Sequence, residues 1–261
     1  MKDEKARPGS YSVILHPCAF MRAFRHRSDQ LEHIDKGDYT PEEYEGCMVE
    51  LRRVNRFMGD SAALRRSLNR EESHSSLKDF SVLDVGAGTG ELLRVVAYWA
   101  RKKGKRARLV GLELNARSAD GILERSKGFP EINAIRGDAL RLPFVDNSFE
   151  LAICSLFTHH LTNEEVIVVL RELGRIARRR ILVIDLFRHP LAYLLYTTVG
   201  RLVLYNRLLR EDGALSILRS FSPGELKHLA VQAKLTDVRV ERRFPFRLVL
   251  SATGSREEVA L

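Results

Sequence analysis

The stretch Ser81-Val-Leu-Asp-Val-Gly-Ala-Gly-Thr-Gly-Glu-Leu-Leu93 decides the fold of this chain. Its apolar residues Val82 to Val85 predict a buried strand, and the run from Glu91 predicts the start of a helix. Between them, glycines at alternate positions allow a sharp bend and the close approach of a ligand to the backbone. The first turn of the helix offers free N–H groups and a positive dipole end. The stretch therefore predicts a ligand crevice at the carboxyl end of a first parallel strand.

The spacing of the glycines separates two ligand classes. A dinucleotide site usually has the pattern G-x-G-x-x-G, with the pyrophosphate at the helix dipole. Here Gly86, Gly88 and Gly90 form G-x-G-x-G, and Asp84 precedes them at the strand end. This spacing disfavours a nicotinamide oxidoreductase. The plain alternative is a strand–turn–helix unit that holds no ligand.

Polar residues follow or end three further predicted strands. These are Arg108 to Leu114 with Glu113, Ile132 to Ile135 followed by Asp138, and Phe149 to Cys154 followed by Ser155. Glu113 lies 23 residues after Gly90, and an acid at a spacing of about 20 binds a ribose hydroxyl in such folds. Turn acids that cap strands or helices explain any one of these positions, but they explain the whole set poorly.

Four segments of the chain together form a pattern typical of one enzyme family. They are Asp84-Val-Gly-Ala-Gly-Thr-Gly90, Gly111-Leu-Glu-Leu-Asn115, Gly137-Asp-Ala-Leu-Arg-Leu-Pro-Phe144 and Cys154-Ser-Leu-Phe-Thr-His-His-Leu161. The set resembles the small-molecule class I methyltransferases that depend on S-adenosylmethionine (SAM), and most of all the ubiquinone/menaquinone-biosynthesis methyltransferase group. Phe221-Ser-Pro-Gly-Glu-Leu226 and Arg243-Phe-Pro-Phe-Arg-Leu248 look like its branch associated with type III polyketide synthases. The resemblance covers roughly residues 28 to 250.

The resemblance implies SAM as methyl donor and assigns binding residues position by position. Gly86, Gly88 and Gly90 would line the methionine end, Glu113 would take the ribose hydroxyls, Asp138 and Ala139 would flank the adenine, and Ser155 would lie near the sulfonium. Asp84, Ala87 and Leu114 complete the predicted donor site.

Methyl transfer from a sulfonium requires mainly that donor and acceptor be held in line, close together and dry. We therefore predict neither a nucleophile nor a metal. A phenol or enol acceptor benefits from a base, and His159 and His160 stand where such a base would act. The alternative is that these histidines only cap the next helix or pack. A looser pairing is that of Asp185 with His189.

The alternation of strands and helices predicts an α/β, doubly wound, Rossmann-like sheet of seven strands. The sheet would be parallel except for an antiparallel C-terminal hairpin formed by Val238 to Arg242 and Arg247 to Ser251; the fifth strand would span Arg180 to Leu186. Residues 1–76 would form a helical extension or lid, and residues 77–261 the methyltransferase domain. Helix-opening capping boxes begin at Thr40, Thr162 and Ser222.

The most apolar segment runs from Pro190 to Tyr205. It is too short, and too interrupted by Arg201, for a membrane span of about 20 apolar residues. We predict an inserted helix over about residues 190–210 that roofs a substrate pocket. Peripheral contact with a membrane is the alternative interpretation.

Charge and cysteine content limit the partners and the compartment. The formal net charge of +9 would suit phosphate-rich partners, but the cations are scattered, so we expect no nucleic-acid partner. The three cysteines are far apart, which favours a reducing, cytoplasmic setting.

The leading functional prediction is a SAM-dependent methyltransferase acting on oxygen or carbon of a small phenolic, quinone or polyketide-like acceptor, as in secondary metabolism. The alternatives are an RNA methyltransferase, suggested by the charge, and a non-catalytic SAM-binding protein. The sequence leaves the acceptor and the oligomeric state open.

Overall fold

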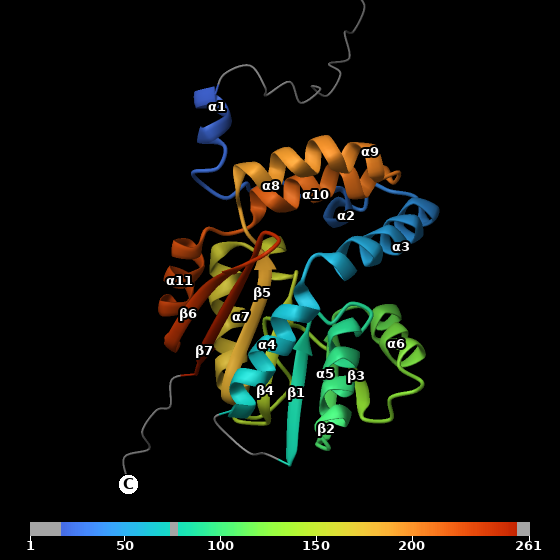
Figure 1. Ribbon diagram of the computed structural model, residues 1–261, viewed down its shortest axis with the longest axis vertical. Coiled ribbons are helices and arrows are strands. Elements are labelled where there is room, and N and C mark those ends of the chain that lie inside the picture. Colours follow the sequence, from blue (N-terminus) through green and yellow to red (C-terminus); the bar gives the residue numbers. More distant parts are fainter. Residues whose placement is uncertain (1–16, 74–77, 255–261) are drawn as a thin grey trace, which may run out of the picture.

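A computed structural model describes residues 17–73 and 78–254. Seven strands form one sheet in the order β3-β2-β1-β4-β5-β7-β6 (Figure 1). Their bounds are β1 Asp79–Val85, β2 Arg106–Glu113, β3 Ile132–Arg136, β4 Phe149–Ser155, β5 Ala177–Leu186, β6 Thr236–Arg243 and β7 Arg247–Thr253. The first five strands are parallel, and β7 runs antiparallel to both β5 and β6. The predicted doubly wound sheet with an antiparallel hairpin is therefore confirmed.

The order of the strands reverses between β1 and β4. Val85 at the end of β1 lies beside Leu112 of β2 on one side and Cys154 of β4 on the other. In open α/β sheets, ligands bind outside the carboxyl ends of the strands at such a reversal. The glycine stretch after β1 therefore lies at the position where this architecture forms a site.

Helices cover both faces of the sheet. On one face lie α4 (Asp60–Ser73), α5 (Glu91–Lys102) and α6 (Ala116–Arg125), and on the other lie α7 (Asn163–Ile176) and α11 (Pro223–Gln232). In α5, side chains spaced by four residues, such as Leu92, Val96 and Ala100, are buried against the sheet. Burial of both sheet faces explains why the central strands read as continuous apolar runs.

The three predicted capping boxes are confirmed at the starts of helices. Thr40, Thr162 and Ser222 each accept a hydrogen bond from the backbone N–H three residues later, and the glutamate at that position binds back. Strand β5 begins at Ala177 rather than at Arg180, because α7 ends at Ile176 and the chain enters the sheet directly.

The remaining helices form a separate cap above the carboxyl edge of the sheet (Figure 1). They are α1 (Pro17–Arg22), α2 (His33–Lys36), α3 (Pro41–Phe57), α8 (Pro190–Leu195), a π-helical turn (Tyr196–Gly200), α9 (Arg201–Val203) and α10 (Arg207–Arg219). Cys47 of α3 packs with Leu204, Leu208 and Leu209 in a small core of the cap. The predicted boundary at residue 76 lies outside the described residues, and α4 packs on the sheet rather than in the cap.

The apolar insertion differs from the single helix predicted over residues 190–210. It is a helical hairpin, because the chain breaks at Leu204 and restarts as α10 with Asn206 as its N-cap. Glu50 of α3 accepts hydrogen bonds from the N–H groups of Tyr205 and Asn206, which fixes this turn against the cap. Within the described ranges, no helix combines the length and the apolarity that crossing a bilayer would require.

Candidate functional site

The turn after β1 has the conformation that its glycines allow. Gly86, Gly88 and Gly90 all have positive φ angles, between 57° and 70°. The N–H of Gly86 donates to the carbonyl of Leu112 at 3.0 Å, which holds the turn to β2. A Cβ at Gly90 would lie 2.9 Å from Ile122 Cγ2, whereas a Cβ at Gly88 would meet no heavy atom within 4 Å. The turn is thus closely packed at Gly90 and open at Gly88. We call the backbone of Gly86 to Gly90 the glycine cradle, because its open side leaves room for a ligand.

Glu113, at the end of β2, points toward this turn. Its Oε1 accepts a hydrogen bond from the N–H of Gly88. Burial raises the pKa of Glu113, and hydrogen bonds from the N–H groups of Gly88 and Leu114 oppose that rise. A carboxylate beside an open glycine cradle is suited to accept hydrogen bonds from ligand hydroxyls. The predicted neighbour Leu114 is largely exposed at the rim.

Asp84 lies beneath the cradle and lacks a partner for one oxygen. Its side chain is buried, and Oδ1 has no hydrogen-bond partner within the described part of the chain. Burial, followed by the charge of Glu113, raises the pKa of Asp84 well above its ordinary value. Buried polar atoms are rarely left unsatisfied, so an orphaned carboxyl beside a cradle indicates a site for a ligand donor group. The cradle, Asp84 and Glu113 together fit a ligand that carries ammonium and hydroxyl groups.

Replacing Asp84 by asparagine is expected to flatten the pH dependence of stability in the ligand-free protein. Because the folded-state pKa is raised, the folded state binds the proton more tightly, and stability falls as the pH rises above about 4. Asp84→Asn removes this loss of stability, which amounts to about 1.4 kcal/mol for each unit by which folding raises the pKa of Asp84. Chemical denaturation between pH 4.5 and 7.5 measures it, with the exposed Asp138→Asn as control. Parallel pH profiles for wild type and Asp84→Asn would contradict this account.

The other predicted donor-site residues lie along the same edge of the sheet. Asp138 follows β3 and accepts a hydrogen bond from the N–H of Leu140 at 2.8 Å, which forms a tight turn. Ala139 is buried beside it, and Ser155 ends β4 next to Ile184 of β5. The structure therefore brings the predicted residues to one edge, with Asp138 and Leu114 at its exposed rim.

Phe157 is a residue of this site that sequence reasoning missed. Its ring packs over the first glycine of the turn, so that a Cβ at Gly86 would lie 3.0 Å from the ring atoms. Leu156 before it has a positive φ of 51°, and this bend directs the chain back over the cradle. A phenylalanine in an apolar run gives no sequence signal that separates it from a core residue.

His159 forms a buried pair with Asp185 at the ends of β4 and β5. Its Nδ1 lies 2.7 Å from Asp185 Oδ1, and its backbone N–H donates to Oδ2 at 3.1 Å. Burial would raise the pKa of Asp185, but the His159 imidazole and hydrogen bonds from His159, Thr158 and Leu186 hold it at about 2. The carboxylate thus fixes the ring and leaves Nε2 available for proton transfer.

The looser pairing of Asp185 with His189 is not what the structure contains. The Asp185 carboxylate is hydrogen-bonded to the Thr158 hydroxyl, the His159 ring and the backbone N–H of Leu186. His189 instead caps α8, where its Nδ1 accepts a hydrogen bond from the N–H of Leu191 at 3.1 Å. Sequence proximity favoured His189, whereas the parallel register of β4 and β5 brings His159 to Asp185.

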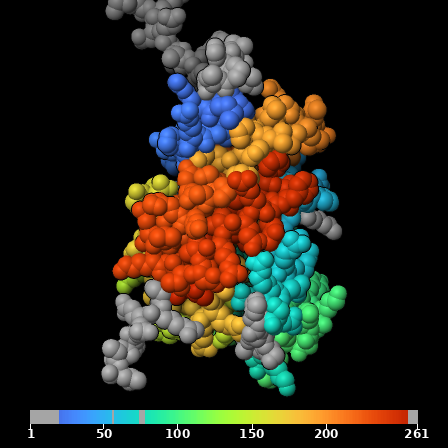
Figure 2. All heavy atoms as spheres, turned by 60° about the vertical axis from the view of Figure 1, so that its left-hand side comes forward, coloured from blue at the N-terminus to red at the C-terminus, as the bar shows by residue number. Residues whose placement is uncertain are grey.

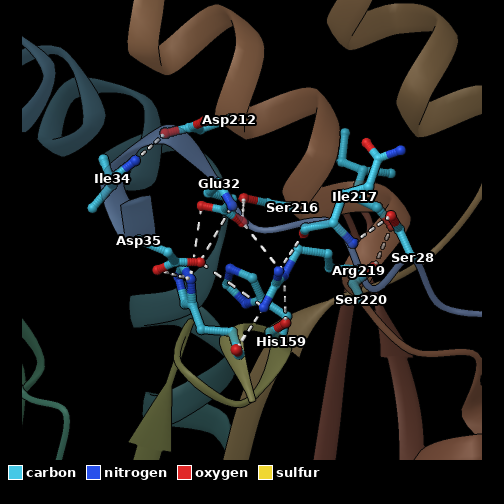
Figure 3. Close-up of polar contacts among 12 residues, drawn as sticks. Ser28, Glu32, Ile34, Asp35, His159, Asp212, Ser216, Ile217, Arg219 and Ser220 are labelled. Carbon is cyan, nitrogen blue, oxygen red and sulfur yellow. Dashed lines mark hydrogen bonds and ion pairs between the residues drawn. The ribbon is translucent and has the colours of Figure 1, made fainter. Parts of the chain in front are cut away.

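The helical cap is joined to the histidines by a network of buried charges (Figure 3). Arg219 of α10 donates to the carbonyls of His159 and His160, at 3.2 and 2.5 Å. Arg27 donates to the carbonyl of Arg219 at 2.6 Å and also to that of His159. Glu32 is buried and accepts a hydrogen bond from Ser216 Oγ at 2.7 Å. None of these residues was singled out from the sequence, because they converge from segments nearly 200 residues apart.

Glu32, His159 and His160 are also the one group whose side chains suit a metal among the described residues. Their candidate ligand atoms lie within 4.8 Å of one another. The two imidazole rings lie face to face in a tilted arrangement, with centroids 4.2 Å apart and an interplanar angle of 35°. Arg219 Nε lies 4.0 Å from Glu32 Oε1, and this positive charge opposes a second cation. Arg219 and the hydrogen bond that holds His159 Nδ1 to Asp185 therefore favour proton transfer over metal binding here.

Part of the chain is similar to known proteins. Residues 82–180 match a family model described as "Methyltransferase domain". A 70-residue stretch is 37% identical to 2-phytyl-1,4-naphtoquinone methyltransferase from Thermosynechococcus vestitus. That match covers 27% of this chain and 30% of the relative's length.

Solved structures show the same fold. A SAM-dependent methyltransferase from Aquifex aeolicus superposes with a TM-score of 0.54 at 15% identity, covering 77% of this chain and 96% of that one. A TehB-like SAM-dependent methyltransferase from Corynebacterium glutamicum gives 0.51 at 15% identity, with coverages of 83% and 100%. The family match covers the glycine cradle, Glu113 and the strands around them, and the whole sheet has the fold seen in these SAM-dependent methyltransferases.

Proposed function

We propose that the protein transfers the methyl group of SAM to an oxygen or carbon atom of a small hydrophobic acceptor of the phenol, quinol or polyketide type. The observation that carries this proposal is the buried His159–Asp185 pair at the carboxyl edge of the sheet. A phenol or an enol must lose a proton as it is methylated, and an oriented imidazole supplies the base. The donor itself supplies an electrophilic methyl group activated by the positive sulfur.

Different residues of this chain bind the donor and remove the proton of the acceptor. The backbone at Gly86, Gly88 and Gly90 contacts the donor, and Glu113 accepts hydrogen bonds from the hydroxyl groups of the donor. Asp185 holds His159 with Nδ1 bound, so that Nε2 takes the proton of the acceptor. The cap keeps this region dry, since His159 is only 4% exposed. A dry site favours transfer to the acceptor over loss of the methyl group to water.

The acceptor class is supported by the curated relative. That protein is named as a methyltransferase of a naphthoquinone, although only 30% of its length is matched. None of the matches described above bears on the branch associated with type III polyketide synthases. We therefore propose the wider class of hydrophobic phenols and quinols, with polyketide pyrones as further candidates.

A donor-consumption screen tests the proposal. The full chain is incubated with SAM and a panel of alkylphenols, reduced quinones and polyketide pyrones, and methylated products are identified by mass. We expect turnover with at least one member of the panel. Saturable SAM binding without turnover on any of them would instead favour a non-catalytic SAM-binding protein. Turnover on RNA alone would favour the second alternative.

A further inference from the structure

The helical insertion presents a stripe of large apolar side chains to solvent. Helix α8, the π-helical turn and α9 run continuously from Pro190 to Val203. The stripe consists of Leu191, Leu194, Leu195, Val199, Leu202 and Val203, which are between 43% and 80% exposed. Most of these positions follow steps of three and four residues and so share one helical face. The stripe therefore faces outward, and the expectation that the insertion roofs a substrate pocket stays a prediction for its other face.

The opposite face of the same segment is already buried in the cap. Ala192 and Gly200 are buried, and the Tyr196 hydroxyl donates a hydrogen bond to the carbonyl of Leu209 in α10. A side chain at Gly213 of α10 would collide with the Tyr196 ring, which shows how closely the two helices pack. A helix that packs on a core through one face and meets water through the other normally has a polar outer face. This one is apolar on both.

Arginines flank the stripe, and the two segments nearest to it carry no carboxylate of their own. Residues 190–210 and 17–28 contain no Asp or Glu. Phe20 and Phe24 lie 6.2 and 5.7 Å from Tyr193 between ring centroids, which holds α1 and the residues after it against α8. Figure 2 shows the blue N-terminal segment beside the light-orange insertion at one end of the molecule. Exposed cations at this end are Arg22, Arg25 and Arg201.

We propose that this apolar stripe docks the protein onto an anionic lipid bilayer. The continuous helix of 14 residues is roughly 21 Å long and too short to span, so it would lie in the plane of the interface. The leucines enter the boundary between headgroups and acyl chains, and the arginines meet the lipid phosphates. The exposed aliphatic face together with the flanking cations Arg22, Arg25 and Arg201 favours an anionic membrane over a second copy of the chain. The proposal is independent of the acceptor, because it concerns binding without turnover.

Vesicle flotation of the full chain tests this surface. We expect the protein to float with vesicles that contain phosphatidylglycerol, to float less with pure phosphatidylcholine, and to be released by high salt. Leu195→Glu combined with Leu202→Glu should lower the vesicle-bound fraction roughly tenfold or more, because charges replace two leucines that the bilayer would bury. The matched control is Val145→Glu, which adds a charge at another exposed aliphatic residue, in the loop before β4. SAM affinity, measured for each variant, shows that the fold is retained.

Three outcomes would overturn the proposal. The first is that wild-type protein with intact SAM binding floats with neither type of vesicle. The second is that Val145→Glu loses flotation as strongly as the stripe variant. The third is a dimer in size-exclusion chromatography that dissociates in the stripe variant, which would assign this face to a second copy of the chain.

Discussion

Replacing His159 with asparagine is expected to lower the turnover number on a phenolic acceptor by roughly a hundred- to ten-thousand-fold. The asparagine amide takes the place of Nδ1 and retains the hydrogen bond to Asp185, but it has no counterpart of Nε2. The buried carboxylate is therefore not left without a partner, and folding is preserved. SAM affinity should change less than twofold, since His159 does not line the glycine cradle. Steady-state kinetics and a separate SAM titration measure the two effects.

The control for this substitution is His189→Asn. His189 caps α8 through its side chain, and asparagine is an equally good N-cap, so turnover should stay within twofold of wild type. His160→Asn tests the second candidate base, which is partly exposed and whose Nδ1 lies 3.5 Å from Asp35 Oδ1 and 3.7 Å from Glu32 Oε2, farther than His159 lies from Asp185. If His160→Asn abolished turnover and His159→Asn left it intact, the assignment of the base to the Asp185-oriented imidazole would be refuted.

Removing the charge of Asp60 is expected to lower the free energy of unfolding by about 3–5 kcal/mol. Asp60 begins α4 and receives two hydrogen bonds from Arg247 of β7, with Nε–Oδ1 at 2.6 Å and Nη2–Oδ2 at 3.2 Å. Both side chains are buried, and Arg247 Nη1 already lacks a partner in the described part of the chain. Asp60→Asn keeps the volume but leaves the guanidinium charge uncompensated. Urea denaturation measures the change.

An exposed ion pair gives the matched control. Arg106 and Asp79 form an equally short pair, but their side chains are 85% and 58% exposed. Asp79→Asn should therefore cost less than about 1 kcal/mol. The apolar double variant Asp60→Leu with Arg247→Met should be more stable than Asp60→Asn, because no unpaired charge remains. Equal losses for Asp60→Asn and Asp79→Asn would show that burial of the pair does not matter.

Local sequence patterns predicted the strands, the helices and the geometry of the glycine turn well. Each strand that ends at a polar residue was visible because apolar runs and turn residues alternate, and three capping boxes marked helix starts correctly. The position of Glu113 beside the glycine turn follows from parallel pairing of β1 with β2. Such features depend on short stretches of chain, which is why the sequence reveals them.

Long-range convergence was not predictable in the same way. Asp185 meets His159 rather than His189, and Arg27, Glu32 and Arg219 meet beneath the cap, because the topology joins distant segments. The outward direction of the apolar stripe was also missed. Hydrophobicity alone does not tell which face of an apolar helix packs on its neighbour, and here Tyr196 and Gly200 decide it.

Titration of the full chain with SAM in a calorimeter tests the central claim, that the glycine cradle and Glu113 hold the donor. We predict saturable binding at one site per chain. Glu113→Gln should weaken it about ten- to a hundred-fold, because hydrogen bonds to a charged acceptor are lost. The exposed Glu124→Gln in α6 should leave it unchanged. Absence of saturable binding by folded protein, or equal affinity of the wild type and Glu113→Gln, would contradict the account.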